Sequence, residues 1–285
     1  MKLYKEIIHN NFRQPPYVDA MKKMLTSGEL LNWIWKRLLS AKVFSLPHEK
    51  NMPALPVEAD KRKNLFPPFN RFWIEQEYDD NITNTKGILG LLVDCFTLKD
   101  KYLYFVDGFQ KIYNLFPPIG PLSPIKFEID KESGRLLENT ITFVNIVGLP
   151  DERIRAVCGW FGQVIVRFLW FINIPGIPIK SEEFDSRTVR FINNKSNRKC
   201  PTYKYYTLPV IKPGEKKKTI GKDGHRDLSL HQVRGHIATY DEKGLFGKYY
   251  GTFFISDHWR GKISFGLINK DYSLKDRLSF ANNNG

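Results

Sequence analysis

The chain has 285 residues and a net charge of +14, with 42% hydrophobic and 14% aromatic residues. This composition excludes a disordered chain, and the length allows one large domain or two modest ones. Its three cysteines, at positions 95, 158 and 200, form no CxxC pair and are odd in number, which argues against a zinc ribbon and a disulfide framework. We therefore expect a cytoplasmic protein, since the N-terminal MKLYKEIIHNNF also lacks the apolar run of a secretory signal.

The N-terminal segment is predicted to be helical. Apolar residues between positions 17 and 46 recur at helical spacing, and Gly28 interrupts the pattern, which favours two consecutive helices or one bent helix. Residues 47–68 carry five prolines and are expected to form an irregular connection. Residues 1–66 are accordingly predicted to be an N-terminal helical segment.

The hydrophobic period then changes to that of strands. Aromatic and β-branched residues dominate five short segments that Asn, Asp, Gly and Pro separate. Because short turns join neighbouring segments, we expect an antiparallel meander of four or five strands. The predicted strands are residues 71–78, 87–97, 101–109, 124–130 and 138–148.

The most apolar run, residues 156–179, contains Arg167 and ends at two prolines. Its uninterrupted apolar part is only about 10 residues, whereas a helix that spans a bilayer needs ~20. We therefore predict no membrane span but a buried helix, at 150–173, that covers the inner face of the meander. Residues 67–179 would form this sheet with its helix, and the fold class is α+β.

The last third of the chain, residues 180–285, is strongly basic. It carries 21 Lys and Arg against 11 Asp and Glu, which gives it +10 of the net charge. Basic surfaces favour phosphate backbones because binding releases counterions. We predict a basic C-terminal β region here, in which the run GEKKKTIGKDGHRD is a loop. The candidate nucleic-acid-binding residues are Lys216, Lys217, Lys218, Lys222, Arg226, His231, Arg260 and Lys262.

Histidines gather in the same region, since four of the six fall between residues 225 and 258. The stretches HQVRGHIATY (231–240) and YYGTFFISDHW (249–259) are predicted to form a hairpin around the turn DEKGLFGK. Alternate residues of a strand share a face, so Arg234, His236 and Tyr240 would lie opposite Val233 and Ile237. A simple hairpin would place Tyr240 near Tyr249 and His231 near His258.

Three kinds of chemistry fit this cluster, and a purely structural role remains open beside them. Metal binding is disfavoured, since HxxxxH on a strand points the rings to opposite faces and no carboxylate or cysteine partner has ligand spacing. We expect no metal and no cofactor. Metal-independent cleavage of RNA would use a histidine to take the 2′-hydroxyl proton, with His236, Arg234, Tyr240 and His258 as candidate catalytic residues. Non-catalytic recognition would use arginines on phosphates and aromatic rings on bases.

The stretch HQVRGHIATY, followed by LFGK, YYGTFF and HWRG, resembles the C-terminal segment of phage-encoded type V-A anti-CRISPR proteins that suppress production of the effector nuclease. In that family an HxxRGHW-like stretch precedes an aromatic, basic strand. His231, Arg234, Gly235 and His236 match it, while Ile237 stands where a tryptophan usually follows. Looser similarity extends to residues 35–56 and to the apolar helix around WFGQVIVRFLWFI.

The resemblance implies a phage-type inhibitor that acts in the host bacterial cytoplasm. Such proteins recognise the nascent N-terminal peptide of the effector nuclease and promote loss of its mRNA. The implied partners are that peptide and the mRNA or ribosome, without a membrane. The alternatives that the residues leave open are a metal-independent endoribonuclease and a non-catalytic RNA-binding module.

Overall fold

The computed structural model describes residues 2–8, 27–55, 63–80, 85–112, 119–137, 140–143, 151–196, 204–209, 229–233, 235–245 and 247–268. Two compact units divide the chain, Met1–Lys212 and Pro213–Gly285. The sequence had predicted boundaries after residues 66 and 179 instead. Helices and a large mixed sheet occur together, which confirms the α+β class.

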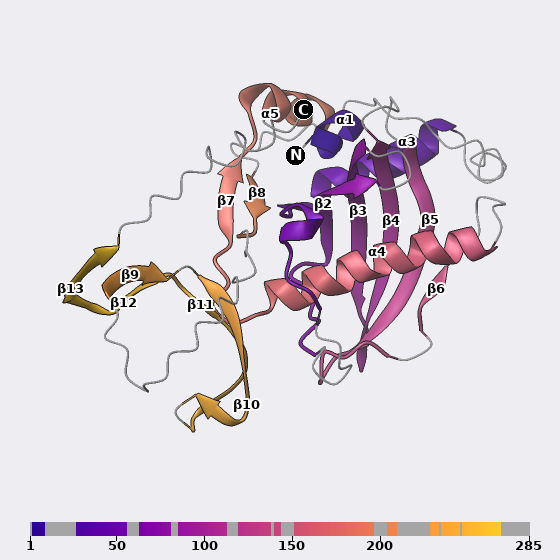
Figure 1. Ribbon diagram of the computed structural model, residues 1–285. Coiled ribbons are helices and arrows are strands. Elements are labelled where there is room, and N and C mark those ends of the chain that lie inside the picture. Colours follow the sequence, from indigo (N-terminus) through magenta and orange to yellow (C-terminus); the bar gives the residue numbers. More distant parts are fainter. Residues whose placement is uncertain are drawn as a thin grey trace. The chain divides into compact units, whose positions relative to one another are not determined.

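An eight-stranded sheet organises the first unit (Figure 1). Its first five neighbours in space form an antiparallel meander, and the short strand β1 is parallel to both β2 and β8. β7 closes the other edge antiparallel to β8. In spatial order the strands are β6 (Thr142–Phe143), β5 (Ile119–Asp130), β4 (Lys101–Ile112), β3 (Thr85–Thr97), β2 (Arg71–Asp80), β1 (Lys42–Ser45), β8 (Lys204–Thr207) and β7 (Lys180–Glu183).

The predicted meander is confirmed, since β2 to β6 pair antiparallel in chain order. Local contacts stabilise the tight turns between its strands. The β3–β4 turn is closed by the Leu98 amide, which donates to the Lys101 carbonyl at 2.8 Å. After β5 the Asp130 carboxylate accepts from the Ser133 amide at 2.7 Å. Gly134 then adopts φ +65°, a conformation that favours glycine, and packs against Asn64. Of the predicted strand at 138–148 the structure describes only residues 140–143, which contain β6, and residues 138–139 and 144–148 lie outside the described part.

Helix α4 (Asp151–Ile172) crosses one face of this sheet, as predicted for the apolar helix (Figure 1). Its buried Phe168 packs on Phe44 of β1 and Phe72 of β2, with ring centroids 5.1 and 5.6 Å apart. Arg167 donates to the Pro53 carbonyl at 2.7 Å and thereby holds the chain that leaves the 3-10 turn η1 (Glu49–Asn51). Among the described helices, α4 alone has the length and hydropathy of a membrane span, over Arg155–Ile172, and half of that window is buried in the protein.

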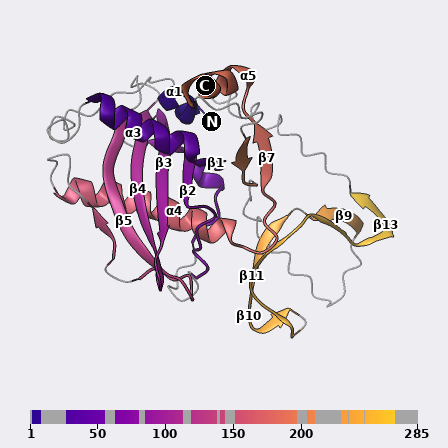
Figure 2. The ribbon, with the colours of Figure 1, turned by 180° about the vertical axis from the view of Figure 1, so that it is seen from behind.

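The opposite face is covered by α1 (Lys2–Ile8) and α3 (Ser27–Ser40), as Figure 2 shows. Both helices bury their apolar side chains in a core with Trp73 of β2 and Phe109 of β4. Helix α5 (Ser186–Ser196) adds Ile192 to the same core. The sheet is therefore a central layer between helices on both faces, which explains why its middle strands read as nearly continuous apolar runs.

Two local predictions for this unit need correction. Residues 42–45 were placed in the helical segment but form β1, because Val43 and Phe44 are buried on opposite faces between two parallel neighbours. Helix α3 begins at Ser27, close to the predicted break at Gly28, and residues 9–26 lie outside the described part. Strands β7 and β8, from the predicted basic β region, belong to the large sheet.

Candidate nucleic-acid interface

The second unit contains the predicted hairpin, built from β10 (His236–Leu245) and β11 (Tyr249–Ile255). The register differs from the predicted one, in which Tyr240 would lie near Tyr249. Tyr240 pairs with Gly251, and Leu245 pairs with Tyr249. β10 runs on through the predicted turn, with an irregularity between Tyr240 and Leu245. The reversal falls at Gly247, whose φ of +66° suits glycine in a tight turn.

His236 and Tyr240 share one face of this hairpin, as alternation predicted. Their direct and diagonal neighbours across the ladder are apolar, and the Tyr240 ring lies 6.5 Å from that of Phe253. Four residues along a strand correspond to about 13 Å, so His236 and Tyr240 are too far apart to share one transferred proton. The other face carries the Thr239–Thr252 hydroxyl pair, at 3.0 Å.

A separate three-stranded sheet holds the remaining motif residues. β9 (Ser229–Val233) pairs antiparallel with β12 (His258–Arg260) and parallel with β13 (Lys262–Ile268). The register joins His231 to Arg260 and His258 to Val233, so the two histidines lie on neighbouring strands but not opposite one another.

The expectation of one continuous strand over 231–240 is therefore wrong, and the chain changes sheets around Gly235. A Cβ at that glycine would come within 2.7 Å of the tip of the Phe254 ring, so a larger residue at this position would displace the ring. The predicted faces do not continue across this break. His236 and Tyr240 belong to one sheet, and His231, His258 and Arg260 to the other.

Aromatic and basic side chains of β11 and β12 are exposed to solvent. Tyr249, Tyr250 and Trp259 are 55%, 54% and 55% exposed. The Tyr250 hydroxyl donates to the Gly247 carbonyl at 2.9 Å, which orients its ring beside the turn. His258 and Arg260 are exposed as well, and alternation on β12 places them on the face opposite Trp259. His258 Nδ1 lies 3.0 Å from the Ser256 carbonyl.

Several predicted residues lie outside what the structure describes. Lys216, Lys217, Lys218, Lys222, Arg226 and Arg234 are not described at all, and only the backbone of His231 and Lys262 is. Within the described residues, no three His, Cys, Asp or Glu side chains come together as metal ligands. The described surface of this unit offers exposed aromatic rings and cations.

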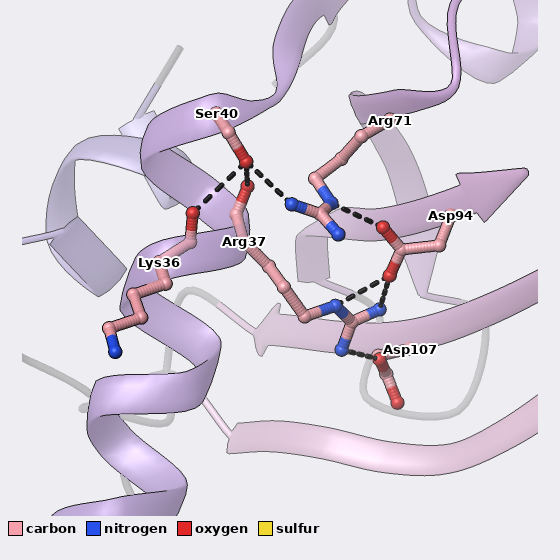
Figure 3. A network of polar contacts seen from close by, with 6 residues as sticks. All are labelled: Lys36, Arg37, Ser40, Arg71, Asp94 and Asp107. Carbon is pink, nitrogen blue, oxygen red and sulfur yellow. Dashed lines mark hydrogen bonds and ion pairs between the residues drawn. The ribbon is translucent and has the colours of Figure 1, made fainter.

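A buried network of charges in the first unit was not predicted from the sequence (Figure 3). Arg37 of α3 donates to Asp94 of β3 at 2.6 Å and forms an ion pair with Asp107 of β4 at 2.5 Å. Arg71 of β2 donates to Asp94 as well, and to the Ser40 hydroxyl at 2.7 Å. The signal was present, since Asp94 and Asp107 are lone carboxylates in otherwise apolar strands, which requires cationic partners if they are buried.

Burial raises the pKa of the Asp107 carboxyl, and the guanidinium of Arg37 opposes the shift. Arg37 itself lies 4.1 Å from the ring centre of Trp33, one helical turn earlier. The network therefore ties α3 to the two central strands of the sheet.

No protein-family model, curated protein or solved structure that was compared with the chain matches it.

Proposed function

We propose that the second unit binds RNA and that the chain is a phage-type inhibitor of host CRISPR immunity. In this proposal it recognises the nascent N-terminal peptide of the effector nuclease and promotes loss of the mRNA that encodes it. The observation that carries RNA binding is the exposure of Tyr249, Tyr250 and Trp259, together with that of the cations Lys248 and Arg260, which are their neighbours in the sequence.

Exposed aromatic rings are stabilised when a ligand removes them from water. A base stacked on an aromatic side chain contributes about 1–3 kcal/mol, and each phosphate next to a Lys or Arg releases counterions. Residues 213–285, which make up the second unit, hold 13 Lys and Arg against 8 Asp and Glu, and this net charge of +5 adds a long-range attraction for the same ligand. Messenger loss and peptide recognition are supported by the resemblance of residues 231–261 to the anti-CRISPR family.

Metal-independent cleavage of RNA is the second candidate, with His236 as a single general base, since the separation of about 13 Å along the strand keeps Tyr240 from sharing its proton. His258 lies in the other sheet of the unit, which argues against the four-residue catalytic group that the sequence suggested. Binding without cleavage is therefore the function that the described geometry favours.

The decisive experiment co-expresses the chain with three reporters. The first carries the effector's N-terminal codons, the second encodes the same peptide with synonymous codons, and the third keeps the nucleotides but shifts the reading frame. We expect reporter mRNA and protein to fall for the first two and to stay level for the third, because the peptide is what is recognised. Unchanged levels for all three would contradict the inhibitor proposal.

RNA binding by the second unit is tested separately, with purified full-length protein and a labelled fragment of the reporter mRNA. The Tyr249→Ala/Trp259→Ala variant should bind at least fivefold more weakly, which corresponds to the loss of about 1 kcal/mol of stacking. Val157→Ala, an exposed apolar change on α4, is the control and should bind as the unmodified chain does. RNA cleavage in excess EDTA that His236→Ala abolishes would establish the ribonuclease instead.

A further inference from the structure

Helix α3 ends at Ser40 and leaves the last residues of β3 and the first of β4 uncovered on its side of the sheet. Two phenylalanines stand there in solvent, with Phe96 50% and Phe105 37% exposed. Their rings pack edge to face, with centroids 5.7 Å apart and an angle of 86°. On the α4 side of the same strands, Cys95, Tyr104 and Val106 are buried, so the exposure is confined to one face.

An open depression of about 630 Å³ adjoins Phe96. A second exposed ring, Phe69, lines it, and the Lys42 ammonium lies 5.9 Å from the centre of that ring. Arg71 also lines the depression and is held in place by Asp94 and Ser40. The lining residues are Ser40, Lys42, Phe69, Asn70, Arg71, Asp94, Cys95, Phe96 and Thr97.

The rim of this face carries more available positive than negative charge. Asp94 is shared by Arg37 and Arg71, so neither of its oxygens is left without a cation. Glu128 of β5 is likewise shared, by Lys101 at 2.7 Å and Lys126 at 3.8 Å.

Asp130 and Lys42 also leave the rim with more available positive charge than negative charge. The Asp130 carboxylate is occupied by the amide and hydroxyl of Ser133. Lys42 forms no ion pair with a described residue and is exposed. The carboxylates are thus engaged, and Lys42 is the cation of this rim that remains for an anionic ligand, while Arg71 and Lys126 each share a carboxylate with a second cation.

We propose that this surface, the β3–β4 aromatic face (Phe96 and Phe105 with Arg71 and Lys126), together with the adjoining depression at the strand ends that Phe69 and Lys42 line, binds a single-stranded nucleic acid. Bases stack on the phenyl rings, and the phosphates lie against the surrounding cations. One nucleotide occupies the depression between Phe69 and Phe96. Exposed rings on an antiparallel sheet are a common platform for unpaired bases, since every base offers a flat face to an aromatic ring.

A peptide fits this face less well. β3 and β4 are each paired on both sides, so their backbones have no free edge to which an extended peptide could add as a strand. Nucleophilic chemistry is also disfavoured, because burial raises the pKa of the Cys95 thiol to about 12 and keeps it protonated near neutral pH. The face thus presents flat apolar rings and cations, which are complementary to the bases and phosphates of a nucleic-acid strand.

The proposal adds a second nucleic-acid site, in the first unit, and does not depend on the function proposed for the second. It is tested with full-length protein that carries Tyr249→Ala/Trp259→Ala, so that binding by the second unit is weakened. The probes are labelled oligouridylate and oligothymidylate of about eight nucleotides, within the usual site size, and the readout is fluorescence anisotropy. Comparison of the two probes separates RNA from single-stranded DNA as the preferred source of the same chemistry.

In this background Phe96→Ala and Phe105→Ala should each raise the Kd for the preferred probe at least fivefold, and Lys42→Gln should flatten its salt dependence. Val157→Ala on the opposite side of the sheet is the matched control and should leave the Kd unchanged. Photo-crosslinking with 4-thiouridine in the RNA probe, or 4-thiothymidine in the DNA probe, should label peptides that contain residues 94–105.

Equal affinities for the Phe96→Ala, Phe105→Ala and Val157→Ala proteins would overturn the proposal, as would crosslinks that fall only beyond residue 212. Tight binding of an acidic peptide that Phe96→Ala abolishes, with no binding of either probe, would assign the face to a protein partner instead. None of these results bears on the three-reporter experiment, so the two proposals fail separately.

Discussion

Arg37 is the residue on which two buried carboxylates depend. It is 5% exposed, and it contacts Asp94 and Asp107 from a helix that apolar packing and the Arg71–Ser40 hydrogen bond also hold against the sheet. A buried ion pair adds little net stability compared with an apolar substitute, but removing one partner leaves an uncompensated charge. The network therefore makes the position of α3 on the sheet specific.

Replacing this guanidinium should be costly. We expect Arg37→Met to lower the free energy of unfolding by about 3–5 kcal/mol at neutral pH, measured by urea denaturation. Burial already raises the pKa of Asp107, and without Arg37 this carboxyl will hold its proton to still higher pH. The stability deficit should therefore shrink as the pH falls and Asp107 becomes neutral.

The neighbouring position provides the control for this change. Lys36→Met lies on the exposed side of the same helix and should alter the free energy of unfolding by no more than about 0.5 kcal/mol. Equal stability of the Arg37→Met and Lys36→Met proteins would show that the network does not hold α3 in place.

At the scale of elements, α4 packs tightly against the sheet. Gly108 of β4 lies directly under Phe161, and a Cβ at this glycine would come within 2.1 Å of the buried ring. Here glycine is required by the approach of a neighbouring side chain rather than by backbone conformation.

A methyl group at this contact should separate the helix from the sheet. We expect Gly108→Ala to destabilise the protein by about 1–3 kcal/mol through overpacking, measured as a lower urea midpoint. Gly159→Ala on α4 is the matched change, since nothing lies within 4 Å of its Cβ position, and helix propensity predicts a gain of up to about 1 kcal/mol. A midpoint for Gly108→Ala at or above that of Gly159→Ala would contradict this account of the interface.

Elements defined by their own sequence were predictable. The strands of the meander and α4 have strong periodicity, clear turns and sufficient length. β1 was not predictable, because its four residues form a strand only between β2 and β8, which are distant in sequence.

The candidate interface was predictable to a similar extent. Alternation gave the shared face of His236 and Tyr240, but no local signal tells that the chain changes sheets at Gly235. The β3–β4 aromatic face could not be predicted from the local sequence either, because the exposure of Phe96 depends on where α3 ends on the folded sheet.

For the whole molecule, the division after Lys212 has an experimental consequence. All described strands of the large sheet and the helices on both its faces lie before this point. We expect a fragment of residues 1–212 to unfold cooperatively in urea with a near-UV circular dichroism spectrum of folded aromatic residues. A non-cooperative transition would mean that the first unit needs the second.

A shorter fragment gives the matched comparison. Ending the chain at residue 179 removes β7, α5 and β8, and with them the stacking of Phe184 on Tyr4 and the Lys5–Asp185 ion pair. It also leaves β1 with an unpaired edge. This fragment should lose cooperativity or aggregate, whereas the fragment of 212 residues should not.

The core that joins Leu3 of α1 to Ile192 of α5 has a consequence for synthesis of the protein. At a translation rate of 5–20 residues per second, roughly 10 to 40 seconds separate the two ends of this core. Throughout that time the apolar side chains of α1 have no complete binding partner in the nascent chain. Until Phe184 and Ile192 have been synthesised, the apolar side chains of α1 can pack only on the part of this core that the sheet supplies, and we expect them to be accessible to chaperones during that interval.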